Sequence, residues 1–224
     1  MLEKLFPSYI FHSDATKLDI FADIQEEIKQ YLATKKPNYL PWFGKTHKVY
    51  ERSFQTDHAN LLGHCPLLRS FVIDQITQFL FQLHPDHIVK LAMNHLSIGA
   101  SWATKFDDRD YAHQHHHIPD EISGVYYYQV PSKTSINTEQ NNKQEGNLFF
   151  CTPVAGHHLC SLVSPTQRVF IAPKEGQLIL FPSFLEHGVM PCDDKEKSRI
   201  SISFNGSIHS NIVLQQIIRR DTQK

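Results

Sequence analysis

Two stretches of the chain decide its fold: His115–Tyr128, which reads HHHIPDEISGVYYY, and Gly176–His187, which reads GQLILFPSFLEH. In the first stretch a His-x-His step leads into a β-branched and aromatic run, and in the second a similar run leads to a further histidine. Side chains two positions apart on a strand point to the same side, so His115 and His117 share a face. A third imidazole from a distant strand, His187, can complete one face of a metal site. The two stretches therefore predict strands that bring three histidines together.

The bulk properties indicate a single domain, residues 1–224, because this length supports one sizeable core and is short for two catalytic domains. The 22 Lys and Arg nearly balance the 23 Asp and Glu, so no overall field favours nucleic acid or an anionic membrane as partner. The sequence has no apolar run of about 18 residues. Its first residues, Met1–Pro7, lack the apolar segment of a signal peptide. We expect a cytoplasmic protein.

The four cysteines support the same location. Cys65, Cys151, Cys160 and Cys192 are irregularly spaced, with no Cys-x-x-Cys pair. Neither a zinc knuckle nor a disulfide framework is indicated, and reduced thiols are expected.

The patterning predicts a mainly β fold: a double-stranded β-helix core of the jelly-roll or cupin-like kind, supported by N-terminal helices. Apolar residues recur at helical spacing over 17–34, after a cap at Asp14, and over 66–83, which opens with proline. From residue 87 the pattern changes to short strands separated by turns. The expected strands are 88–98, 122–130, 147–151, 169–173, 177–181 and 199–204. Helical support thus occupies about residues 1–86 and the β-helix core about residues 87–210.

Two further segments carry expectations about ligands. Residues 132–145 are polar and predict a mobile hairpin insertion, which could also be an active-site lid. Residues 42–52 interleave aromatic and basic side chains, which suits either an edge strand or contact with a peptide or single-stranded nucleic acid.

The three histidines suit iron chemistry. Fe(II) in an oxygenase needs three protein ligands on one face, leaving positions for a bidentate co-substrate and oxygen. His115, His117 and His187 can supply that face. The usual site has a carboxylate where this sequence has His117. Three neutral imidazoles leave the metal more positive than the carboxylate-containing triad, which favours a dianionic ligand such as a 2-oxo dicarboxylate.

Two other interpretations stay open at this point. Glu121 could replace His117 as ligand, because the spacing of His115, His117 and Glu121 resembles a cupin motif, and a cupin-type dioxygenase or isomerase needs no 2-oxo acid. A non-catalytic protein could instead close the metal with a fourth ligand, His113 or Glu121, and use it for stability alone.

Further residues are candidates for holding a diacid. Arg199 begins an alternating strand that points Arg199 and Ser201 to one face, and a guanidinium with a neighbouring hydroxyl suits a distal carboxylate. Tyr127 shares a face with Ser123 and Val125, so we expect its hydroxyl to point toward the same carboxylate. Asn94, a polar residue in an apolar run, is a candidate to hydrogen-bond the co-substrate or substrate.

The ordered succession of these motifs resembles a family of 2-oxoglutarate/Fe(II) oxygenases found in marine bacteria and phages and related to the prolyl hydroxylases. The resemblance covers about residues 88–207 and rests on these motifs: His115-x-His117 leading into 122–127, GNLFF at 146–150, 176–183, His187-Gly188-Val189, and RISISFN at 199–205.

The resemblance implies an Fe(II)- and 2-oxoglutarate-dependent dioxygenase that hydroxylates its substrate and releases succinate and CO2. It implies iron held by His115, His117 and His187, with 2-oxoglutarate reaching Arg199 and a tyrosine at the position of Tyr127. It names no substrate, so a small molecule and a peptidyl side chain both remain open; neither nucleic acid nor a membrane is expected as partner.

Overall fold

A computed structural model describes residues 8–34, 54–55, 60–107, 109–131, 146–153, 168–192 and 197–221. Predictions for 132–145 and 42–52 lie outside these ranges, as does Cys160. Cys65, Cys151 and Cys192 are free thiols. In the part of the chain that is described, no helix combines the length and apolar character needed to span a membrane.

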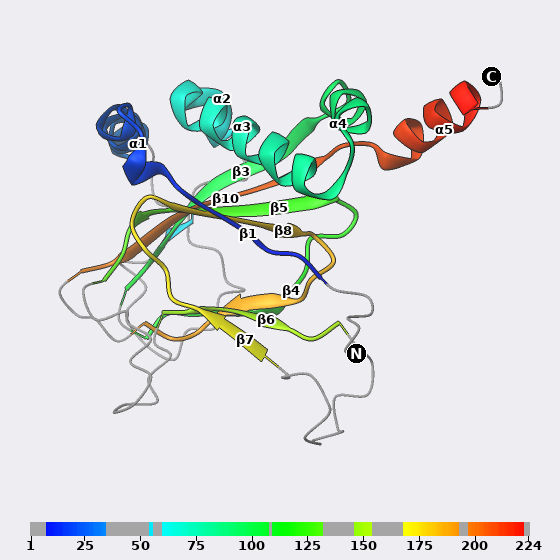
Figure 1. The fold of residues 1–224 in the computed structure, drawn as a ribbon. Coiled ribbons are helices and arrows are strands. Elements are labelled where there is room, and N and C mark those ends of the chain that lie inside the picture. Colours follow the sequence, from blue (N-terminus) through cyan, green and yellow to red (C-terminus); the bar gives the residue numbers. More distant parts are fainter. Residues whose placement is uncertain are drawn as a thin grey trace.

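Two antiparallel sheets face each other and form the double-stranded β-helix that the sequence predicted (Figure 1). The larger sheet has the order β1-β8-β5-β10-β3-β2 and the smaller one β4-β9-β6-β7. The strands of the larger sheet are β1 (Phe11–Asp14), β8 (Gln177–Pro182), β5 (Ile122–Gln129), β10 (Arg199–Ser207), β3 (Ser97–Phe106) and β2 (Phe54–Gln55). Those of the smaller sheet are β4 (Ala112–His115), β9 (His187–Val189), β6 (Leu148–Cys151) and β7 (Arg168–Ile171).

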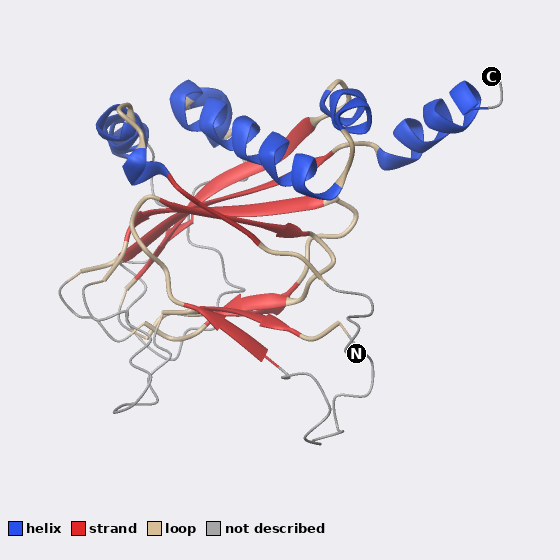
Figure 2. Ribbon diagram, in the orientation of Figure 1, coloured by secondary structure: helices blue, strands red, loops and turns tan. Residues whose placement is uncertain are grey.

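The helices lie on the outer side of the larger sheet, away from the smaller one (Figure 2). They are a 3₁₀ turn η1 (Ala15–Lys17), α1 (Phe21–Thr34), α2 (Leu61–His64), α3 (Pro66–Leu83), α4 (Asp86–Met93) and α5 (Ser210–Asp221). Proline at the first turn of α3 fits the N-terminal preference, because its missing N–H would have had no partner there.

Strand alternation divides the larger sheet between two environments. Tyr126 and Ile202 belong to the core shared with the helices, whereas Val125, Tyr127 and Ile179 belong to a second core on the side of the smaller sheet. Successive residues of one strand therefore serve opposite faces. Any side chain that serves a site between the sheets must occupy the second face.

Several predicted boundaries were correct, and one strand was wrong. The helix at 66–83 matches α3, and the first helix begins at Phe21, because Asp14 accepts a bond from the Thr16 N–H and caps η1 instead. The range 88–98 is not a strand: α4 runs to Met93 and β3 begins at Ser97. A short apolar run reads equally well as helix or strand, which explains the error. Helical support thus extends past residue 86, while β1 comes from the N-terminal segment and pairs with β8.

We expect Gly124→Ala to destabilise the fold by about 1–3 kcal/mol, because overpacking a core has a cost of this order. A Cβ at Gly124 would clash with the ring of Phe204 and lie 2.8 Å from Leu180 Cδ2. Urea unfolding followed by circular dichroism measures the change. The matched control is Gly99→Ala, whose Cβ meets only Asp120 Oδ1 at 3.9 Å and should change stability by less than about 0.5 kcal/mol. Equal effects of the two substitutions on stability would contradict the close packing of Phe204 and Leu180 against Gly124.

Candidate metal centre and co-substrate cavity

A cavity of about 340 Å³ lies between the two sheets. Its lining comes from both sheets and from the loop after β4, and is mostly apolar with a few polar groups, as ligand sites usually are. The lining residues are Ala100, Trp102, Thr104, Phe106, Ala112, His115, His116, His117, Ser123, Gly124, Val125, Leu148, Phe181, His187, Val189, Arg199, Ser201, Ser203, Phe204 and Asn205.

The structure brings His115, His117 and His187 together in this cavity. His115 ends β4 and His187 begins β9, and the two are directly paired across the smaller sheet. His117 follows in the loop, where its backbone N–H donates to the Ser183 carbonyl oxygen at 3.0 Å. The three side chains offer ring nitrogens that all lie within 4.8 Å of one another, a spacing that could hold one metal ion.

Backbone carbonyl groups fix the orientation of two of these rings. His115 Nδ1 lies 2.6 Å from the His113 oxygen, and His187 Nδ1 lies 2.8 Å from the Leu185 oxygen. Each Nδ1 must carry its proton to donate to a carbonyl, so each Nε2 keeps a free lone pair. A metal-binding histidine typically has this support on its other nitrogen.

Burial keeps these two imidazoles neutral. It lowers the pKa of His187 to about 3, with His115 nearby adding to the effect, and it lowers the pKa of His115 as well. Burial disfavours the charged form. Both rings therefore present unprotonated nitrogens at neutral pH, which is the form that binds a metal.

Arg199 lies in the same cavity as a buried cation. It is 2% exposed, its Nη1 donates to Ser201 Oγ at 3.3 Å, and its guanidinium lies 5.0 Å from the Tyr127 ring centre. Within the described residues, Nε has no hydrogen-bond partner and no carboxylate forms an ion pair with this side chain. A buried guanidinium without a carboxylate partner is suited to bind an anionic ligand.

Tyr127 lies on the face of β5 that is turned toward the smaller sheet, as the alternation predicted, but it is not among the residues that line the cavity. It is completely buried, and its hydroxyl has no hydrogen-bond partner among the described residues. Burial raises the pKa of this phenol, while the neighbouring Arg199 opposes the shift. Tyr126 points the opposite way, into the core beneath the helices, and its ring packs edge-on against Phe71.

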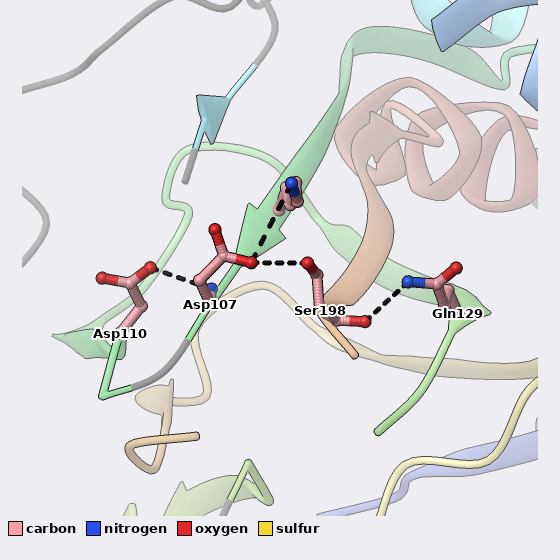
Figure 3. Close-up of polar contacts among 5 residues, drawn as sticks. Asp107, Asp110, Gln129 and Ser198 are labelled. Atoms are coloured by element: carbon pink, nitrogen blue, oxygen red, sulfur yellow. Dashed lines mark hydrogen bonds and ion pairs between the residues drawn. The ribbon is translucent and has the colours of Figure 1, made fainter. Parts of the chain in front are cut away.

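A polar network holds the beginning of β10 next to Arg199 (Figure 3). Ser198 Oγ donates to the Asp107 carboxylate, and Gln129 Nε2 donates to the Ser198 carbonyl oxygen at 2.9 Å. The Asp107 N–H donates to Asp110 Oδ2 at 2.9 Å. The network ties the ends of β3, β5 and β10 together. Sequence reasoning missed it, because no spacing rule relates these residues.

The two rival metal ligands lie elsewhere. Glu121 accepts from the Ser207 hydroxyl and from the N–H groups of Ile208 and Ser210, and so caps the start of α5. His113 is exposed, and its ring lies 5.0 Å from that of Tyr111. Neither residue belongs to the histidine cluster.

Asn94 does not lie in the cavity, so its assignment to the co-substrate needs correction. It is an exposed residue at the C-terminal end of α4, where its backbone N–H donates to Ala92 and Lys90. The error follows from the mistaken strand at 88–98. The strand from this part of the chain that does line the cavity is β3, through Trp102 and Thr104. Its residues 101–104, Ser-Trp-Ala-Thr, do not alternate between polar and apolar, so the sequence contains no period-two signal for this face.

Comparisons with known proteins agree with the arrangement. Residues 100–205 match the family model described as 2OG-Fe(II) oxygenase, where 2OG is 2-oxoglutarate. A search of curated protein sequences found no match.

Solved structures share the fold at low sequence identity. HygX from Streptomyces hygroscopicus, with nickel and 2-oxoglutarate bound, has a TM-score of 0.55 at 9% identity, over 89% of this chain and 83% of that one. A 2OG-Fe(II) oxygenase family oxidoreductase from Burkholderia pseudomallei has a TM-score of 0.50 at 14% identity, covering 83% and 78%. A Trichoplax adhaerens prolyl hydroxylase in complex with a hypoxia inducible factor peptide has a TM-score of 0.50 at 12% identity, covering 92% and 86%.

We expect His187→Ala to weaken Fe(II) binding by more than about 100-fold, because losing a ligand should exceed the 10- to 100-fold loss typical of removing a ligand's supporting hydrogen bond. Anaerobic equilibrium dialysis measures the affinity, and circular dichroism of the metal-free protein checks folding. His113→Ala removes an exposed histidine from the same run and is the matched control. Stoichiometric iron in His187→Ala would refute the assignment.

Proposed function

We propose that this protein oxidises its substrate at an iron ion held by His115, His117 and His187, with 2-oxoglutarate anchored by Arg199. The match of residues 100–205 to the 2OG-Fe(II) oxygenase family model and the cluster of three histidines support the proposal. When bound, iron and the 2-oxo acid supply the oxidising chemistry, with succinate and CO2 as products. The protein supplies ligands, orientation and a cavity that excludes water.

The donor set fits Fe(II). Three imidazoles form one group, and the two with carbonyl-bound Nδ1 atoms have Nε2 available as the ligand atom. Imidazole is a suitable ligand for ferrous iron, and a three-residue face leaves positions for exogenous ligands. The lowered pKa values of His115 and His187 mean that protons do not compete with the metal at neutral pH.

The other end of the cavity fits the distal carboxylate of 2-oxoglutarate. Arg199 Nε and the Tyr127 hydroxyl are buried donors without partners among the described residues, and Ser201 adds a hydroxyl beside them. A carboxylate can accept from several donors at once and neutralises the guanidinium. Assistance by Ser201 and Tyr127 completes the proposed clamp.

Charge favours the same co-substrate. Three neutral imidazoles leave Fe(II) with its full double positive charge, whereas a carboxylate ligand would reduce it. Arg199 adds a further cation to the cavity, and none of the described cavity-lining residues is an aspartate or glutamate. A dianion held between the histidine cluster and Arg199 would compensate this charge.

The observation that carries the proposal is the buried guanidinium of Arg199, which forms no ion pair with any described residue and lies in the same cavity as the histidine cluster. A cupin-type enzyme or a metal-stabilised binding protein gives this buried cation no role. Glu121, which those alternatives recruit as a ligand, is engaged in capping α5.

The substrate class is left broad. A HygX structure with a TM-score of 0.52 holds hygromycin B, and the Trichoplax adhaerens structure holds a peptide fragment. By analogy of fold, a small molecule or a peptidyl side chain is the proposed substrate.

A cytoplasmic location is consistent with the free thiols of Cys65, Cys151 and Cys192.

An anaerobic titration of the Fe(II)-loaded protein with 2-oxoglutarate tests the proposal. We expect a visible metal-to-ligand charge-transfer band that saturates at one equivalent. Arg199→Ala should weaken 2-oxoglutarate binding by about 10- to 100-fold, because a charge-assisted hydrogen bond contributes about 1.5–3 kcal/mol. Arg168→Ala, which removes an exposed arginine at the start of β7, is the matched control. Bound iron without any band would instead favour the cupin-type or binding-protein alternatives.

We expect His117→Asp to keep iron and to lower the affinity for 2-oxoglutarate several-fold, because the new carboxylate reduces the positive charge that attracts the dianion. The same band and an iron assay measure both effects. Glu121→Gln should leave iron affinity unchanged if His117 is the third ligand. Loss of iron in Glu121→Gln with unchanged folding would instead identify Glu121 as the third metal ligand in place of His117.

A further inference from the structure

Polar side chains of β10 line the cavity from one end to the other. Residues 199, 201, 203 and 205 all face it, as alternation requires. Arg199 pairs with Phe106 at one end, and Asn205 pairs with Ala100 and Ser123 at the other. The six steps from residue 199 to residue 205 span about 20 Å. The cavity therefore has an arginine end and an asparagine end.

The histidine cluster lies toward the asparagine end. The ring of His117 lies 5.9 Å from that of Trp102, which is paired with Ser203. The ring of His187 lies 4.7 Å from that of Phe181, which is paired with Ser123. A co-substrate that reaches from the histidines to Arg199 therefore leaves Asn205 outside its path.

Two buried serines fix the amide of Asn205. Ser123 Oγ donates to Asn205 Oδ1 at 2.9 Å and lies 2.7 Å from Ser183 Oγ. Because the Ser123 hydrogen is directed at Asn205, Ser183 is the donor in the second contact. Ser123 is 1% exposed and Ser183 is fully buried, so this chain is shielded from water.

The amide nitrogen is left available. Asn205 is 7% exposed and lines the cavity, and among the described residues its Nδ2 has no hydrogen-bond partner. This N–H opens onto the cavity, where a bound ligand can accept from it. The hydrogen bond from Ser123 occupies the amide oxygen of Asn205, and the amide N–H remains free to donate to a ligand.

We propose that Asn205 is a substrate-binding residue whose Nδ2–H donates to a carbonyl-type oxygen, of an amide or a carboxylate, next to the C–H bond to be oxidised. Ser123 and Ser183 are positioning residues that hold the amide in this orientation. The inference rests on the proposed function, because it assigns the arginine end to 2-oxoglutarate. It restricts the substrate to molecules with such an acceptor near the reacting carbon.

The test uses the full chain loaded with Zn(II), a diamagnetic substitute for iron, and 2-oxoglutarate, and follows side-chain N–H signals by NMR. Acetamide and acetate are the probes, and they separate an amide acceptor from a carboxylate. Loss of a signal pair in Asn205→Asp identifies the Asn205 amide. The Trp102 indole N–H, identified by comparison with Trp42→Phe, is an independent reporter in the cavity.

We expect at least one probe to shift the Asn205 pair and the Trp102 signal in a saturable way. Asn205→Leu should weaken that binding at least about 10-fold by the Trp102 signal, as removal of a buried hydrogen-bond donor does. Ser123→Ala retains Asn205 and should also weaken binding, and Ser123→Thr, which restores a hydroxyl, should recover it. A Trp102 shift with the same affinity in Asn205→Leu overturns the proposal. So does the absence of any shift at Asn205 with both probes.

The design separates this inference from the proposed function. The 2-oxoglutarate step is followed first on the Trp102 signal in wild type and in Arg199→Ala. If 2-oxoglutarate does not bind, the proposed function fails, and the probes then test Asn205 in the zinc-loaded protein alone. If 2-oxoglutarate binds and the probes do not, only the role of Asn205 fails.

Discussion

The pairing of β10 between β3 and β5 is the constraint on which the rest of the structure depends. Its register places Arg199, Ser201, Ser203 and Asn205 on one face, and the opposite face, with Ile202 and Phe204, packs against the helix-covered core. A shift of one residue would exchange these faces, placing the guanidinium in the core beneath the helices and the apolar side chains in the cavity. The network of Ser198, Asp107 and Gln129 fixes the strand at the position where this register begins.

Burial of charge then distinguishes the two kinds of ligand in the cavity. Burial lowers the pKa of His115 and His187, so both rings are neutral and can offer a nitrogen lone pair to a metal. Arg199 cannot lose its proton in this way and remains a cation. One end of the cavity thus suits a metal ion and the other end suits an anion, although both are lined by apolar groups. The arrangement would allow a single small cavity to accommodate a cation and a dicarboxylate together.

The sequence predicted the fold class and the meeting of the three histidines and Arg199 in one place, because each rests on a local rule: alternation in strands, a His-x-His step, and polar residues on an apolar face. It failed at Asn94, where an apolar run of helical length resembled a strand. It also failed to single out the hydrogen bonds that join Asn205 to Ser123 and Ser123 to Ser183, since the three residues come from different strands or loops. Contacts of this kind depend on the pairing register between strands that are distant in the sequence. Local patterns in a single sequence do not reveal that register. The assignment of ligands stays a prediction until metal binding is measured.

The division of the larger sheet into two faces also bears on how such a protein can change. The helices pack on one set of alternating side chains, and the cavity is lined mainly by the other set, although Phe204 belongs to the helix-covered core and also lines the cavity. Substitutions at Trp102 or Ser203 can therefore reshape the cavity while the helix-covered core keeps its packing. The same scaffold can acquire a different selectivity through a few point changes, which makes it a favourable starting point for directed evolution toward new substrates.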